Sequence, residues 1–73
     1  MEDKEILGYA IPKKSMKDSI IGMNLDPDKR YEIYNKIKYE DSSIVLELKT
    51  ESGKVLPYCA SFFDVEPVDL LNF

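Results

Sequence analysis

The hydrophobic and polar positions along this chain alternate in two central stretches. Such alternation, with one side chain turned toward a core and the next toward water, is typical of a half-buried β-strand. It predicts strands over residues 30–39 and 44–49, joined by a polar turn at residues 40–42. In the first of these strands, the side chains expected on the core-facing side are Tyr31, Ile33 and Ile37.

A tight turn and a third strand follow the alternating pair. Residues 51–54, Glu-Ser-Gly-Lys, predict a hairpin turn in which Gly53 adopts positive φ, a conformation that glycine reaches without steric cost. The chain then returns as a strand over residues 55–59. Because Pro57 has no amide hydrogen to donate to a ladder, this strand is expected either at a sheet edge or with a gap in its ladder.

The outer segments predict a first and a last strand. Residues 4–11 form the first strand, in which Gly8 is expected to mark a bulge or a close backbone approach, and Pro12 ends it. Residues 60–63, Ala-Ser-Phe-Phe, predict a single 3₁₀ turn before a last strand over residues 64–68.

The segment between the first and second strands has no period of two and predicts an irregular loop. Within it, one helical turn is expected to begin with Ser15 as its N-cap and Asp18 as its partner in a partial capping box. Gly22 is expected to end this turn. The triplet Asp26-Pro27-Asp28 predicts a second turn, because proline sets φ at the second position.

Together these elements predict a mainly β fold, a small five-stranded barrel with one helical or 3₁₀ turn. Closing a sheet into a barrel removes its exposed edges. We expect the barrel to span residues 1–68 as a single domain, followed by a short apolar tail over residues 69–73. With 73 residues, the chain is near the lower end of the lengths that fold alone.

The charge of the chain is acidic and unevenly placed. The net charge is −4, and Asp64, Glu66 and Asp69 supply most of the excess, so residues 1–63 are nearly neutral. Proteins that bind phosphate backbones usually carry a basic excess, which makes nucleic acid a disfavoured partner. One lysine cluster in the first long loop leaves contact with phosphate open: Lys13, Lys14 and Lys17.

The residue types that enzymes and metal sites rely on are scarce. The chain contains no histidine, the commonest general base and transition-metal ligand, and its single cysteine, Cys59, cannot build a zinc site. It contains no calcium-binding loop and no glycine-rich phosphate-binding motif. The paired carboxylates at Glu40-Asp41 lie in a turn, where they are expected to be solvated. We therefore predict a protein that is not an enzyme and that uses no cofactor or metal.

The pattern of strands and turns in residues 29–63 resembles that of small SH3-like β-barrel proteins. These proteins are often encoded by phages and prophages of low-GC Gram-positive bacteria. The resemblance implies an SH3-like barrel, but such proteins share no single function. The residues that carry it are Lys29, Tyr31, Ile33, Leu46, Leu48, Ser52, Gly53, Pro57, Tyr58, Ser61, Phe62 and Phe63.

A protein-binding surface is the remaining expectation, and aromatic residues are its first candidates. Tyr34 and Tyr39 flank the polar turn, and Tyr58 lies in the edge strand. Exposed tyrosines anchor interfaces because they supply a large contact area at low entropic cost. Each of these rings has a second interpretation, since so short a chain also needs its aromatic residues for the core.

The C-terminal tail is the second candidate. It combines an acidic residue with apolar ones, a composition that docks into apolar grooves of partner proteins. The alternative is that the same residues cover the open end of the barrel. The tail residues in question are Asp69, Leu70, Leu71 and Phe73.

These observations lead to a functional hypothesis. We expect a cytoplasmic protein, a monomer or weak homodimer, that binds a host or viral protein as a phage-encoded modulator or inhibitor. A cytoplasmic location is suggested by the lone cysteine and by the lack of a membrane-spanning apolar run or secretion signal. Two alternatives stay open: a small nucleic-acid-associated barrel that uses the lysine loop, and a structural subunit of a phage particle or other assembly.

Overall fold

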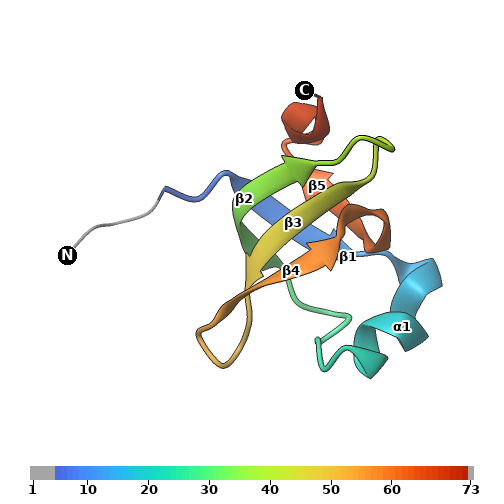
Figure 1. Cartoon of the computed structure of the whole chain (residues 1–73). Helices are drawn as coiled ribbons and strands as arrows, with labels where there is room; N and C mark the ends of the chain where they lie inside the picture. The colour runs from blue at the N-terminus through green and yellow to red at the C-terminus, as the bar shows by residue number, and fades with distance from the viewer. Residues whose placement is uncertain (1–4, 73) are drawn as a thin grey trace.

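The computed structural model describes residues 5–72 of the chain. In this part of the chain the fold is mainly β, with five strands, one short α-helix and three 3₁₀ turns, which confirms the predicted fold class (Figure 1). The elements in chain order are β1 (Gly8–Pro12), η1 (Lys14–Met16), α1 (Lys17–Gly22), β2 (Tyr31–Lys38), β3 (Ile44–Lys49), β4 (Val55–Cys59), η2 (Ala60–Phe62), β5 (Phe63–Glu66) and η3 (Val68–Leu71).

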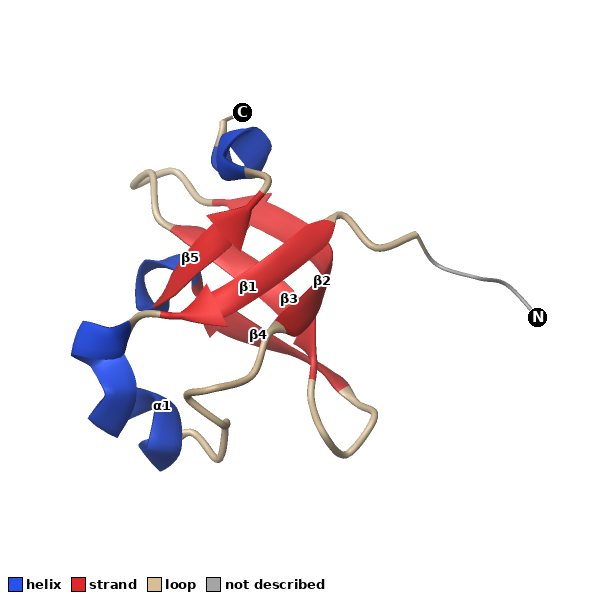
Figure 2. Ribbon diagram, turned by 180° about the vertical axis from the view of Figure 1, so that it is seen from behind, coloured by secondary structure: helices blue, strands red, loops and turns tan. Residues whose placement is uncertain are grey.

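The five strands form one antiparallel sheet in the order β4-β3-β2-β1-β5. The sheet curls, so that β1 and β5 lie across the layer formed by β2, β3 and β4 (Figure 2). The strand that contains Pro57, β4, lies at one end of the order, which confirms the predicted edge position. In residues 5–72 the recorded ladders end at β4 and β5, and hydrogen-bonded closure into a barrel stays a prediction.

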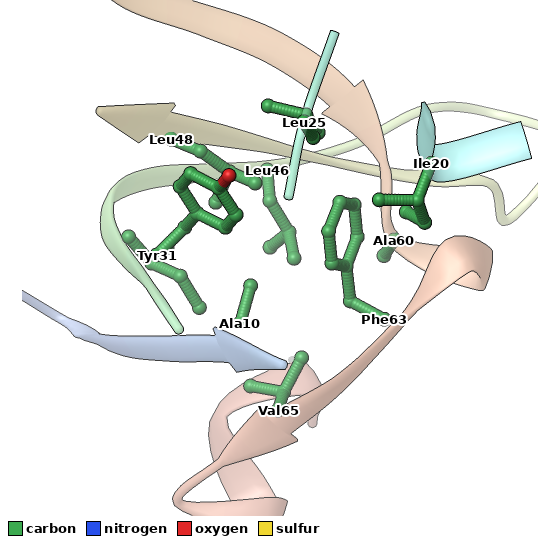
Figure 3. Close-up of a cluster of buried hydrophobic side chains, with 10 residues drawn as sticks. Ala10, Ile20, Leu25, Tyr31, Leu46, Leu48, Ala60, Phe63 and Val65 are labelled. Atoms are coloured by element: carbon green, nitrogen blue, oxygen red, sulfur yellow. The ribbon is translucent and has the colours of Figure 1, made fainter. Parts of the chain in front are cut away.

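The core lies between the two layers of the curled sheet, where side chains from every strand except β4 meet those of α1, η2 and the loop before β2 (Figure 3). Complete burial of one large apolar side chain contributes about 1.5–3 kcal/mol. Its members are Ala10, Ile20, Leu25, Tyr31, Ile33, Leu46, Leu48, Ala60, Phe63 and Val65.

A β-bulge in β2 changes which side chains face the core. Before it, Ile33 pairs with the buried Leu48, but after a shift in register Lys36 pairs with the buried Leu46. The extra residue reverses the alternation of inward and outward side chains. The prediction that Ile37 shares the core-facing side is therefore wrong, because the bulge places Lys36 there instead.

The first strand is shorter than predicted. It begins at Gly8 rather than at Lys4, which lies outside the described residues, and residues 5–7 belong to no strand. At Gly8 the backbone approaches β5 so closely that a Cβ atom would collide with the Glu66 carbonyl oxygen. This confirms the close-approach interpretation of Gly8.

The last strand also differs from its predicted bounds. β5 covers Phe63–Glu66 instead of residues 64–68, because the chain leaves the sheet at Pro67 and turns into η3. The predicted 3₁₀ turn after β4 is confirmed as η2.

The helical part of the long loop starts differently from the prediction. Ser15 lies inside η1 and is not an N-cap; Met16 precedes α1 and offers no capping side chain. The helix does end at Gly22, but the residue with positive φ is Asn24, at 63°. The loop is anchored by apolar burial at Ile20 rather than by a capping box.

Two predicted turns are confirmed by their hydrogen bonds. The Asp28 amide donates to Asp26 Oδ1 at 2.9 Å, as in an Asx turn. In the β3–β4 hairpin, Gly53 has φ of 89° and the Thr50 amide donates to the Lys54 carbonyl at 2.8 Å. No helix among the described residues is both long and apolar enough to cross a membrane.

Candidate functional site

One apolar depression on the surface, which we name the turn pocket, lies where the end of β1, the β2–β3 turn, η2 and η3 meet. It encloses about 460 Å³. Apolar side chains of Ile44, Phe63 and Leu71 line it, and hydroxyl groups and one lysine add polar groups. The complete lining is Lys13, Ser42, Ser43, Ile44, Cys59, Ala60, Ser61, Phe63 and Leu71.

The β2–β3 turn shapes one wall of the turn pocket through local hydrogen bonds. The Tyr39 amide donates to the Ser43 carbonyl at 2.9 Å, and the chain reverses through Ser42, whose φ is 73°. Asp41 Oδ1 accepts from the Ser43 hydroxyl at 2.6 Å and from the Ser43 amide at 3.0 Å. These two bonds favour the carboxylate and lower the pKa of Asp41.

A second depression, the acidic pocket, lies on the same turn. It is lined by Tyr39, Glu40, Asp41 and Ser43, and so shares Ser43 with the turn pocket. The Tyr39 ring is 52% exposed. The turn therefore joins an exposed aromatic ring and two carboxylates to an apolar depression.

Cys59 ends β4 and is exposed at the turn pocket. Its Sγ lies 3.3 Å from the Ser61 hydroxyl. Hydrogen bonds from the Ser61 side chain and backbone lower the pKa of the Cys59 thiol.

A third depression, the edge pocket, lies on the other side of Cys59, along β4. It encloses about 520 Å³ between the long loop, the β3–β4 hairpin and β4. Tyr58 is half-buried here, with its ring edge-on to Phe63 at 6.4 Å between centroids. The lining is Met23, Asn24, Thr50, Glu51, Ser52, Leu56 and Tyr58.

Tyr34 lies apart from these pockets, on the outer face of the sheet. Its hydroxyl donates to Glu32 Oε1 at 2.8 Å, and this bond raises the pKa of Tyr34. On the same face the Arg30 guanidinium stacks over the Tyr9 ring at 4.5 Å and pairs with Glu66 at 3.3 Å. No sequence pattern indicates this cluster, because only the strand register brings Tyr9 opposite both Glu32 and Glu66.

The C-terminal tail packs onto the end of the sheet. Leu70 and Leu71 are half-buried against the core cluster, and the Lys36 ammonium donates to the Leu70 carbonyl at 2.6 Å. Asp69 is exposed, and Phe73 lies outside the described residues. These contacts are those expected of a cap, and Leu71 is at the same time part of the turn pocket.

The structure thus brings only part of the predicted surface together. Tyr39 and Leu71 lie on the two pockets that share Ser43, whereas Tyr58 lines the edge pocket and Tyr34 lies on the outer face. Sequence reasoning did not select Ile44 for the surface, because the alternating pattern assigns it to the core.

Comparisons of this chain with protein-family models, curated proteins and solved structures find no match. Among the described residues, no three histidine, cysteine, aspartate or glutamate side chains gather closely enough to hold a metal ion. Function must therefore be argued from the surface itself.

Proposed function

We propose that this chain is a non-enzymatic protein-binding module of SH3-like type, which binds a host protein and modulates it. The observation that carries the proposal is the apolar turn pocket beside the exposed ring of Tyr39. The phage or prophage origin that we propose with it rests on the resemblance of residues 29–63 to SH3-like barrels.

The turn pocket has the chemistry of a site that takes an apolar side chain. Its apolar lining gives stabilisation of about 25 cal/mol for each Å² of apolar surface removed from water. The hydroxyls of Ser42, Ser43 and Ser61 offer hydrogen-bond partners that orient a bound segment. Tyr39 supplies a rigid, amphipathic ring of the kind that anchors interfaces.

Charge narrows the chemistry of the partner. Glu40 and Asp41 lie on the acidic pocket next to the turn pocket, and the chain as a whole carries a net charge of −4. Opposite charges across an interface steer encounter and suppress wrong partners. We therefore expect a partner segment with an apolar residue for the turn pocket, flanked by lysine or arginine.

The test is affinity capture from a bacterial lysate with the full chain tethered as bait. A single stoichiometric protein is expected with the unmodified chain and with Val68→Ala, a substitution at an 86% exposed position outside the pockets. It should be lost or strongly reduced with Tyr39→Ala, and the activity of the captured protein should change when free chain is added. Equal capture by both variants, or turnover of a substrate by the purified chain, would overturn the proposal.

A further inference from the structure

The open edge of β4 presents backbone polar groups that the sheet does not use. The Thr50 amide donates to the Lys54 carbonyl at 2.8 Å, which makes these two residues a hydrogen-bonded pair of the β3–β4 ladder. Bonded and non-bonded pairs alternate in an antiparallel ladder, so Leu56 and Tyr58 also bond toward β3. The alternate residues of β4 direct their backbone groups away from β3. These residues are Val55, Pro57 and Cys59.

The hydrogen bonds between β2 and β3 give the same orientation for Cys59 independently. The Tyr39 amide donates to the Ser43 carbonyl at 2.9 Å, so alternation makes Ile37 and Val45 a bonded pair of the β2–β3 ladder. The backbone groups of Val45 therefore point toward β2, and its partner Cys59 on β4 is left with outward-facing groups.

This edge is accessible. Val55 is 40% exposed, and Pro57 and Cys59 are also exposed. In residues 5–72, no turn or loop hydrogen bond engages the backbone of Val55 or Pro57, and Cys59, which is the N-cap of η2, offers its outward amide. None of the five residues of β4, Val-Leu-Pro-Tyr-Cys, carries a charged side chain. An exposed, apolar edge strand is a template for pairing with another strand.

We propose that the β4 edge binds an extended segment of a partner protein as an added β-strand. This inference rests on the proposed function and specifies its mode of binding. In strand addition, main-chain hydrogen bonds supply affinity and pockets for alternate side chains supply specificity. One side chain of the added segment enters the edge pocket beside Leu56 and Tyr58, and the segment extends past Cys59 toward the turn pocket.

Pro57 favours a foreign segment over a second copy of this chain. In a symmetric antiparallel pair of β4 strands centred on Pro57, the two prolines would face each other, and neither could donate to the opposite carbonyl. A guest without proline at that position donates to the Pro57 carbonyl, pairs with Val55 and accepts a hydrogen bond from the Cys59 amide. The guest therefore satisfies more of the edge than a second β4 strand can.

Cys59 offers a substitution that removes one edge donor with little disturbance of the fold. Its φ of −68° is close to the value that proline requires, and its amide faces away from β3. Both Cys59→Pro and the matched control Cys59→Ser remove the thiol that contacts Ser61, but only Cys59→Pro also deletes the outward amide donor. Circular dichroism and thermal unfolding check that both variants fold.

The probe is a set of short peptides selected against the full chain from a displayed library with alternating threonine and random positions. We expect Cys59→Pro to weaken their binding about tenfold, because a donor is lost and a guest carbonyl is left unpaired, with little change for Cys59→Ser. In the unmodified chain, the Val55 amide should become protected from hydrogen exchange when a peptide binds. This second readout does not depend on how the proline variant folds.

Three results would overturn the inference. One is equal binding to both variants with no protection at Val55, which rejects strand addition but leaves a protein-binding function intact. Another is failure to select any peptide while lysate capture still depends on Tyr39. The last is self-association of the free chain that disappears in Cys59→Pro, which would make a second copy the occupant of the edge.

Discussion

The hydroxyl of Tyr31 connects the long β1–β2 loop to the β3–β4 hairpin. Its ring is 1% exposed, yet its oxygen accepts from the Asp26 amide at 2.7 Å and lies 3.4 Å from Glu51 Oε2. Lys29 pairs with the same carboxylate at 3.7 Å. A single side chain thus contributes apolar packing to the core and holds together two segments that frame the edge pocket.

Tyr31→Phe tests this connection. We expect the free energy of unfolding to fall by about 1–2 kcal/mol, because the part-buried Asp26 amide loses its acceptor. Denaturant unfolding measures the change, and Tyr34→Phe is the matched control. Its hydroxyl bonds to Glu32 on the outer face, so a change within about 0.5 kcal/mol is expected. Equal losses of unfolding free energy in Tyr31→Phe and Tyr34→Phe would contradict the connecting role of the Tyr31 hydroxyl.

Alkaline pH provides a second test of Tyr31. Burial, and secondarily the charges of Glu51 and Asp26, raise the pKa of Tyr31 above its usual 10.0. A raised pKa in the folded state means that the associated stability is fully present below pH of about 10 and is lost as the pH rises through the folded-state pKa. Unfolding measured across this range should therefore show a steeper loss for the unmodified chain than for Tyr31→Phe. If the stability of the unmodified chain and that of Tyr31→Phe fell in parallel as the pH rises, the raised pKa of Tyr31 would be contradicted.

At the scale of elements, the alternating pattern predicted β2 and β3 because it follows directly from burial. The pattern could not reveal the bulge in β2, since an inserted residue leaves no mark in composition and reverses the faces only beyond it. The expected cap at Ser15 failed for a different reason. Burial of Ile20 against the core places the helix, and this tertiary contact overrides the local capping signal.

Two glycines should respond to alanine with opposite signs. Gly8→Ala places a methyl group against the Glu66 carbonyl oxygen where β1 meets β5, and overpacking of this kind costs about 1–3 kcal/mol. Gly22→Ala, at the end of α1, meets no atom within 4 Å and should stabilise by about 0.4–1 kcal/mol. Thermal unfolding compares the two directly. Unchanged stability of Gly8→Ala would contradict the close β1–β5 approach.

The role of η3 is tested at Leu71. Because this side chain is half-buried on the core cluster, Leu71→Ala should lower the free energy of unfolding by about 1–2 kcal/mol. Val68→Ala, in the same 3₁₀ turn but 86% exposed, should change it by less than about 0.5 kcal/mol. Chemical denaturation of the two variants distinguishes a packed cap from a free docking tail, for which neither substitution would matter.

For the whole molecule, the candidate surface depends on elements that are distant in the sequence. The turn pocket needs Lys13, the β2–β3 turn, η2 and Leu71 to meet, which the curled sheet achieves and no local pattern encodes. Residue type alone drew attention to Tyr39 and to the tail. Residue type could not show that Tyr39 and the tail lie near Ile44 on the surface. It also gave no sign of the Tyr9–Arg30 cluster. An edge position was one of two alternatives predictable at β4, because Pro57 has no amide hydrogen to donate to a ladder.

The most direct test of the account is a residue-by-residue map of amide hydrogen exchange, recorded for the free chain and for its complex with the captured partner. We expect new protection at the amides of Val55 and Cys59, together with altered resonances at Tyr39 and Ser43. Changes confined to the outer face around Tyr9 and Arg30, with Val55 and Cys59 still exchanging freely, would contradict it.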